Sequence, residues 1–113
     1  MSHSPQVLLR HILLCITLVE QYTTGGEDEF FVDGKTRDAV IRNLEIIGQA
    51  VKDIGVEQLV AAEPSISWCD IGDLRNVLAH QYLGVDARLV WNIVVIELPR
   101  LKPVIETLVA SMH

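Results

Sequence analysis

The spacing of apolar residues between positions 36 and 55 limits what this chain can fold into more than any other feature. Apolar side chains recur there in steps of four, three, four and three residues: Val40, Leu44, Ile47, Val51 and Ile54. Residues with this spacing share one face of an α-helix, whereas a half-buried strand would alternate apolar and polar residues. The segment is therefore predicted to be a long amphipathic helix that begins at Asp33 or Thr36 and ends at Gly55.

Helical patterns also cover most of the remaining chain. The other predicted helices span residues 5–22, residues 56–62, residues 67–83 and the residues after Asp86. No strand, repeat or domain boundary is needed to explain the sequence. The predicted fold class is all-α: a small antiparallel bundle of about four to five helices that forms one domain over residues 1–113.

Three local features predict how these helices begin, end or join. Ser67 and Asp70 resemble a capping box, S-x-x-D, at the start of their helix. The linker GGEDEFFVDG, residues 25–34, is expected to be an acidic surface loop pinned by its two phenylalanines. Pro99 and Pro103 are expected to kink the last helix or to restart it as a second segment, because proline lacks the N–H that a helix interior requires.

The chain carries more apolar surface than a small monomer needs. Half of its 113 residues are hydrophobic, and the mean hydropathy is +0.31. The longest apolar run, from Ile12 to Ile16, is far shorter than the ~20 residues of a membrane-spanning helix. No signal peptide is expected, since the first residues lack a basic segment and a small-residue cleavage site. We therefore expect the excess apolar surface to be buried against a second copy of the chain.

The charged residues, cysteines and histidines narrow the function classes. A net charge of −6 argues against broad electrostatic binding of nucleic acid, although a small, positively charged cleft is compatible with it. Cys15 and Cys69 do not form a CxxC pair, and Cys15 lies in an apolar helical run, which favours a reduced thiol and the cytoplasm. The four histidines lack metal-ligand spacing, so no metal and no cofactor are predicted.

The stretch RNVLAHQY, residues 75–82, concentrates groups suited to phosphate chemistry. Arg75 offers a planar, permanently charged fork, and His80 titrates near neutrality and can act as an acid or a base. Asn76 and Tyr82 add an amide and a hydroxyl. On a regular helix Arg75 and His80 lie ~140° apart, while Arg75 and Tyr82 share a face. A site that uses both Arg75 and His80 therefore needs a loosened last turn or a second copy packed across a two-fold axis. The simpler alternative is a helix end whose cations satisfy the dipole and the last carbonyls.

Two further positions in the long helix stand out. Gly48 costs about 1 kcal/mol relative to alanine inside a helix, so we expect the close approach of a neighbouring helix, from this chain or from a second copy, to compensate. Arg37 and Arg42 could line an RNA path, but ordinary surface charge is the simpler interpretation.

RNVLAHQY also matches the R-x(4)-H-x-Y motif of HEPN ribonucleases. Three blocks in order, TRDAVIRNLEIIGQAVKDI, SISWCDIGDLRNVLAHQYLGVD and VWNIVVIELPRLKP, resemble the HepT-like branch of HEPN proteins from about Phe30 to Pro103. Leu74 replaces a methionine that is frequent in that branch, and Gln81 replaces a frequent acidic residue. Both replacements leave the motif intact.

The resemblance implies a specific function. HepT-like proteins are homodimeric toxins of type VII toxin–antitoxin pairs, and they cleave RNA without a metal by attack of the ribose 2′-hydroxyl. It implies that Arg75 stabilises the pentacoordinate phosphate, that His80 is the acid/base and that Asn76 has a supporting, positioning role. The antitoxin is a minimal nucleotidyltransferase that would transfer AMP to Tyr82. Whether dimers assemble further with the antitoxin is left open.

An alternative from a different functional class is a non-catalytic HEPN module that binds nucleotide or serves as the protein partner of a nucleotidyltransferase. The acidic composition favours this module, whereas the complete R-x(4)-H-x-Y motif favours the ribonuclease.

Overall fold

The computed structural model describes residues 3–79 and 86–111, and every regular element in those residues is helical. The elements in chain order are α1 (Pro5–Tyr22), α2 (Gly26–Val32), α3 (Gly34–Ile54), α4 (Val56–Ala62), α5 (Trp68–Gly72), α6 (Leu74–Ala79), α7 (Ala87–Asn92), the π-helical turn η1 (Ile93–Glu97) and α8 (Leu98–Ser111). The predicted all-α fold class is confirmed, although the helices are divided more finely than expected.

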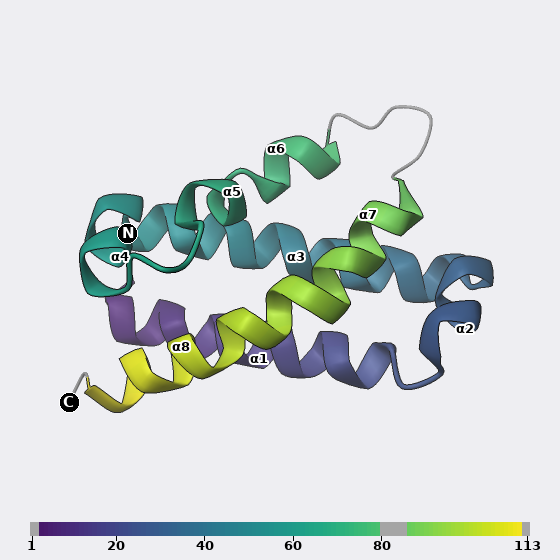
Figure 1. Ribbon diagram of the computed structural model, residues 1–113, viewed down its shortest axis with the longest axis horizontal. Coiled ribbons are helices and arrows are strands. Elements are labelled where there is room, and N and C mark those ends of the chain that lie inside the picture. Colours follow the sequence, from purple (N-terminus) through teal and green to yellow (C-terminus); the bar gives the residue numbers. More distant parts are fainter. Residues whose placement is uncertain (1–2, 80–85, 112–113) are drawn as a thin grey trace.

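Helix α3 is the centre of the bundle. It packs along α1, while α5 and α6 lie against its other side and α8 runs diagonally across the front of the bundle (Figure 1). All five residues of the predicted stripe are buried, which confirms the prediction: Val40, Leu44, Ile47, Val51 and Ile54. Each such side chain contributes about 1.5–3 kcal/mol by leaving water, so this face fixes where the neighbouring helices sit.

Side-chain caps set the start of two helices where the sequence predicts them. Asp33 Oδ1 accepts from the backbone N–H groups of Lys35 and Thr36 at 3.0 and 3.4 Å. The Thr36 hydroxyl donates to Asp33 Oδ2 at 2.8 Å, and this bond lowers the pKa of the carboxyl group by favouring its charged form. Asp86 caps α7 in the same way, by accepting from the N–H groups of Arg88 and Leu89.

The prediction of a surface loop for residues 25–34 was wrong, because most of this segment forms α2. Its acidic residues occupy the first turn, where the helix dipole favours negative charge. Phe30 is fully buried, as the predicted pinning requires. Arg37 Nη1 donates to the carbonyl oxygens of Phe30 and Phe31 at 3.1 and 2.7 Å, which satisfies the end of the helix. Arg37 therefore joins the start of α3 to the end of α2.

The helix predicted over residues 67–83 is also divided. It breaks at Asp73 into α5 and α6, and residues 80–85 lie outside the described part of the chain, so the predicted end near Gly84 cannot be placed. The capping box was wrong: Ser67 stands at the N-cap of α5, but its side chain makes no capping hydrogen bond. Trp68 anchors α5, because its ring is buried and its Nε1 donates to the carbonyl oxygen of Glu63 at 2.8 Å.

The last helical segment follows the expected effect of its first proline. Pro99 has no N–H to offer, and just before it the N–H of Leu98 bonds to the carbonyl oxygen of Ile93, five residues back, which makes the π-helical turn η1. Helix α8 then begins at Leu98, and Pro103 lies inside it.

Two contacts made by Arg88 join α7 to α2. The Arg88 guanidinium pairs with Glu27 at 2.7 Å and lies 4.8 Å from the centre of the Phe31 ring.

Cys15 is buried in the core as predicted, and burial raises the pKa of its thiol. Within the described ranges, no helix is both long enough and apolar enough to cross a membrane.

Candidate active site

Helix α6 presents the first residues of RNVLAHQY. Leu78 is buried against the core and Leu74 is half-buried, so α6 lies on the bundle by one face. Arg75 and Asn76 lie on its exposed surface. His80 and Tyr82, the predicted acid/base and modification site, fall outside the described residues. The structure therefore positions two of the four predicted site residues.

Arg75 reaches across to α3. Its Nη1 donates to Gln49 Oε1 at 3.1 Å, which joins residues 26 positions apart in the chain. Gln49 in turn donates from Nε2 to Asp53 Oδ1 at 2.9 Å. The guanidinium is thus the end of a short chain of hydrogen bonds that starts one turn further along α3.

The junction between α5 and α6 approaches α3 closely at Gly48. A Cβ atom on Gly48 would lie 2.8 Å from the carbonyl oxygen of Ile71 and 3.5 Å from the backbone nitrogen of Arg75. The first distance is too short for a side chain, so only glycine lets the α5–α6 junction approach α3 this closely. The expected close approach at Gly48 is confirmed, and the neighbouring segment belongs to the same chain.

Asn76 bonds within its own turn. Its Nδ2 donates to Asp73 Oδ1 at 3.0 Å, at the break between α5 and α6. The Asp73 carbonyl oxygen also accepts the N–H of Val77, which begins the hydrogen bonding of α6. Asn76 and Asp73 therefore shape the first turn of the helix that carries Arg75.

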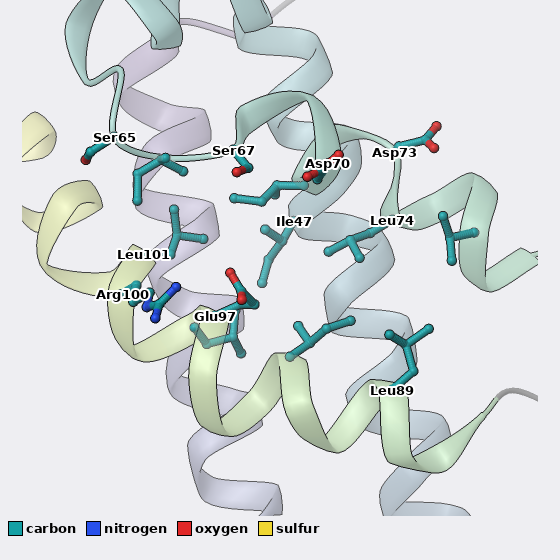
Figure 2. Close-up of a pocket in the computed structure, with 15 residues that line it drawn as sticks. Ile47, Ser65, Ser67, Asp70, Asp73, Leu74, Leu89, Glu97, Arg100 and Leu101 are labelled. Atoms are coloured by element: carbon teal, nitrogen blue, oxygen red, sulfur yellow. The ribbon is translucent and has the colours of Figure 1, made fainter.

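A pocket of about 450 Å³ lies beside α6, between α5–α6 on one side and α7, η1 and α8 on the other. In Figure 2, Ile47, Leu74, Leu89 and Leu101 point into it. The charged residues among its lining are Asp70, Asp73, Glu97 and Arg100. Three carboxylates against one guanidinium make this pocket a poor site for a polyanion, and its apolar interior suits contact with protein.

Arg75 lies on a face of α6 that points away from this pocket. Leu74 and Val77 line the pocket, and on a helix Val77 is ~160° from Arg75. The structure brings Arg75 together with Gln49 and Asp53 of α3, neither of which was predicted to belong to the site. The sequence signal that could have pointed to Gln49 is its neighbour Gly48, which marks where another segment touches α3.

Comparison with known proteins identifies the family. The family profile described as "Ribonuclease HepT-like" matches residues 12–108. A relative from Thermococcus cleftensis, named "Probable ribonuclease HepT", is 38% identical over 109 residues, which cover 96% of this chain and 98% of the relative. The chain belongs to the HepT-like ribonuclease family.

Other HepT-like relatives differ in length. A Methanocaldococcus jannaschii protein named "Gamma-glutamylcyclotransferase and putative RNase" is 39% identical over 103 residues, which cover 90% of this chain but only 46% of that protein. A "Putative RNase" from Caldanaerobacter subterraneus is 34% identical, with 88% of each chain covered. The chain thus spans less than half of one relative and nearly all of others. No solved structure matches it.

The close packing at Gly48 leads to a prediction for this HepT-like chain. Gly48→Ala should lower the free energy of unfolding by about 1 kcal/mol, because overpacking costs about 1–3 kcal/mol and the helix propensity of alanine recovers only ~1 kcal/mol. Urea unfolding followed by circular dichroism measures the change.

Gly34→Ala is the matched control. It lies in the first turn of the same helix, and a Cβ there meets only the Arg37 side chain at an ordinary 3.6 Å. This variant should be at least as stable as the wild type. Equal stability of the Gly48 and Gly34 variants would contradict the packing described at the α3–α6 contact.

Proposed function

We propose that this chain is the toxin of a type VII toxin–antitoxin pair and acts as a metal-independent endoribonuclease. The observation that carries the proposal is the HepT-like family match over residues 12–108, which contains the complete R-x(4)-H-x-Y motif from Arg75 to Tyr82. Residues 1–113 would act as one HepT-like domain. The pair would operate in the cytoplasm, where a buried thiol such as Cys15 remains reduced.

The proposed reaction is an internal transesterification of RNA. The ribose 2′-oxygen forms a bond to the adjacent phosphorus while the bond from phosphorus to the 5′-oxygen breaks, which leaves a 2′,3′-cyclic phosphate and a 5′-hydroxyl. His80 takes the proton from the 2′-hydroxyl and returns a proton to the leaving 5′-oxygen. Arg75 stabilises the extra negative charge of the pentacoordinate phosphate, and Asn76 supports the site as a positioning residue.

We propose that the active form is a homodimer whose site combines both copies. The ~140° between Arg75 and His80 on a regular helix favours pairing each with the partner's motif. The apolar pocket beside α6 offers a contact surface: Val77 and Leu89, on its edge, are both 37% exposed although they are large apolar residues. Burial of these side chains against a second copy would place two copies of α6 next to each other, but Val77 lies ~160° from Arg75 on α6, so a shared site also requires contact with the Arg75 face.

The proposed antitoxin is a minimal nucleotidyltransferase that transfers AMP from ATP to Tyr82. Tyr82 lies seven residues after Arg75, a separation that nearly eclipses the two on a helix. An AMP group there would block RNA by its bulk and by its negative charge next to the phosphate-binding arginine.

The alternative function is a non-catalytic module that binds nucleotide or a nucleotidyltransferase. The observations that favour it are the net charge of −6 and the carboxylates around the pocket. Tight nucleotide binding by a protein that leaves every RNA uncut would support this alternative over the ribonuclease.

The first test of the ribonuclease is cleavage of RNA in the presence of EDTA. The wild type should produce ends with 2′,3′-cyclic phosphate, whereas Arg75→Ala and His80→Ala should each leave the RNA intact, because one lacks the charge on the phosphate and the other the proton carrier. Mapping of the product ends decides the chemistry. Cleavage that persists in both variants would rule out this catalytic assignment.

Subunit mixing tests whether the site is shared between copies. Arg75→Ala and His80→Ala chains are co-expressed so that dimers form at random. A shared site regains about a quarter of the wild-type activity, because half of the dimers are mixed and each has one intact site of two. A site contained within one copy stays inactive in every combination. The two single variants, each co-expressed with itself, are the controls.

Co-expression with the cognate nucleotidyltransferase tests the modification. The intact mass of the chain should rise by whole AMP units, and Tyr82→Phe should stay unmodified because it lacks the acceptor hydroxyl. Mass spectrometry of the purified chain gives the answer. A wild-type chain that gains no AMP beside an active partner would count against this form of neutralisation.

A further inference from the structure

The side chain of Arg75 is held by a residue that the R-x(4)-H-x-Y motif does not include. Gln49 projects from α3 and accepts from Arg75 Nη1 at 3.1 Å, while its own amide nitrogen donates to Asp53 Oδ1 at 2.9 Å. Gln49 and Asp53 are four residues apart, so they are neighbours along one face of α3. The guanidinium is therefore tied to the central helix of the bundle.

The chemistry of the two partners fixes which way the Gln49 amide faces. An ionised carboxylate only accepts hydrogen bonds, so the NH₂ group of Gln49 faces Asp53. A guanidinium only donates, so the amide oxygen faces Arg75. Both contacts are satisfied by one orientation of the amide and neither by the reverse, which makes Asp53 the group that keeps the oxygen directed at α6.

The partner of Arg75 is uncharged, which distinguishes Arg75 from the two cations that form ion pairs, Arg88 and Lys102. Arg88 pairs with Glu27 and Lys102 pairs with Glu20, whereas no carboxylate within residues 3–79 and 86–111 forms an ion pair with Arg75. A guanidinium has five N–H donors, and the bond to Gln49 uses one of them. The contact thus restricts the side chain without neutralising its charge.

The segment that carries Arg75 also approaches α3 at the residue before Gln49. Gly48 allows the α5–α6 junction to approach so closely that its hypothetical Cβ would be 3.5 Å from the Arg75 nitrogen. Gly48 therefore lets the segment that carries Arg75 lie next to α3, and Gln49 holds the guanidinium. A side chain held in this way has fewer orientations to lose when a phosphate binds.

We propose that Gln49 is a positioning residue for Arg75: a neutral tether, oriented by Asp53, that holds the guanidinium ready for a phosphate. The catalytic part of this proposal rests on the proposed ribonuclease function. The tether itself does not depend on that function and has its own measurement.

The first measurement follows the arginine directly. NMR order parameters of the Arg Nε–Hε groups, with Arg75 assigned from the signal lost in Arg75→Lys, report how restricted the side chain is. Gln49→Met removes the acceptor oxygen but keeps an unbranched side chain of similar length. It should lower the Arg75 order parameter below about 0.6, the range of flexible groups. Arg37, which binds the carbonyls at the end of α2, should keep its value and serves as the internal control.

The second measurement follows cleavage. Gln49→Met should lower kcat about tenfold with little change in KM, because a misplaced guanidinium weakens stabilisation of the transition state more than binding of the ground state. Gln49→Glu keeps an oxygen acceptor and should keep the Arg75 order parameter high, but its carboxylate neutralises the guanidinium and faces Asp53, so kcat should stay well below that of the wild type. Gln21→Met, the same change on the exposed surface of α1, should leave both constants unchanged.

The outcomes separate the tether from the ribonuclease. An Arg75 order parameter that is the same in wild type and Gln49→Met would overturn the tether, whatever the cleavage result. A loss of order together with unchanged kcat would overturn the positioning role in catalysis. A wild type that cuts no RNA would refute the proposed function, and the NMR result alone would then decide whether Gln49 holds Arg75.

Discussion

The contact between Gly48 and the α5–α6 junction is the constraint on which the candidate site depends. The carbonyl oxygen of Ile71, in α5, lies 2.8 Å from where a Cβ on residue 48 would be, so only glycine fits at that position. Because α3 is the most extensively packed helix of the bundle, the position of α6 follows from it. Gln49 is the next residue along α3, and the orientation of the Arg75 side chain is therefore determined by the same two helical turns that determine its backbone.

Two faces of α6 differ in their charge and in their apolar surface, and so they suit different kinds of contact. The face toward α3 presents a guanidinium restrained by an uncharged amide. The face toward η1 and α8 presents an apolar pocket with three carboxylates among its lining. Under the proposed function a phosphate would bind at the first face, where the Asp53 carboxylate also lies, whereas a protein surface could bury the second. An acidic chain can thus offer a local site for phosphate without a positive charge overall.

The sequence was sufficient for the parts of the fold that periodicity and capping control. The stripe from Val40 to Ile54 predicted the central helix, and Asp33 and Asp86 predicted helix starts that the structure has. The loop prediction for residues 25–34 failed because acidic composition was taken as a sign of a loop, while the same acids stabilise a helix start. The break at Asp73 was missed because the apolar spacing of Ile71, Leu74, Val77 and Leu78 continues through it without interruption.

The candidate site was predictable where it depends on spacing along the chain and not where it depends on contacts between helices. The motif supplied Arg75, Asn76, His80 and Tyr82, since spacing along the chain is what defines it, and the structure describes the first two. Gln49 was missed because it lies 26 residues from Arg75 and has no distinctive chemistry of its own. Its significance comes from contact across two helices, and Gly48 was the only local signal that such a contact exists.

The described part of α6, Leu74–Ala79, meets α3 through the Arg75–Gln49 hydrogen bond and the close approach at Gly48. The contact at Gly48 is between backbones, whereas the contact at Gln49 is between exposed side chains. The two contacts can therefore be broken separately. Under the proposed function, a partner that displaced the Arg75 side chain from Gln49 would weaken the site while the core of the bundle stayed folded.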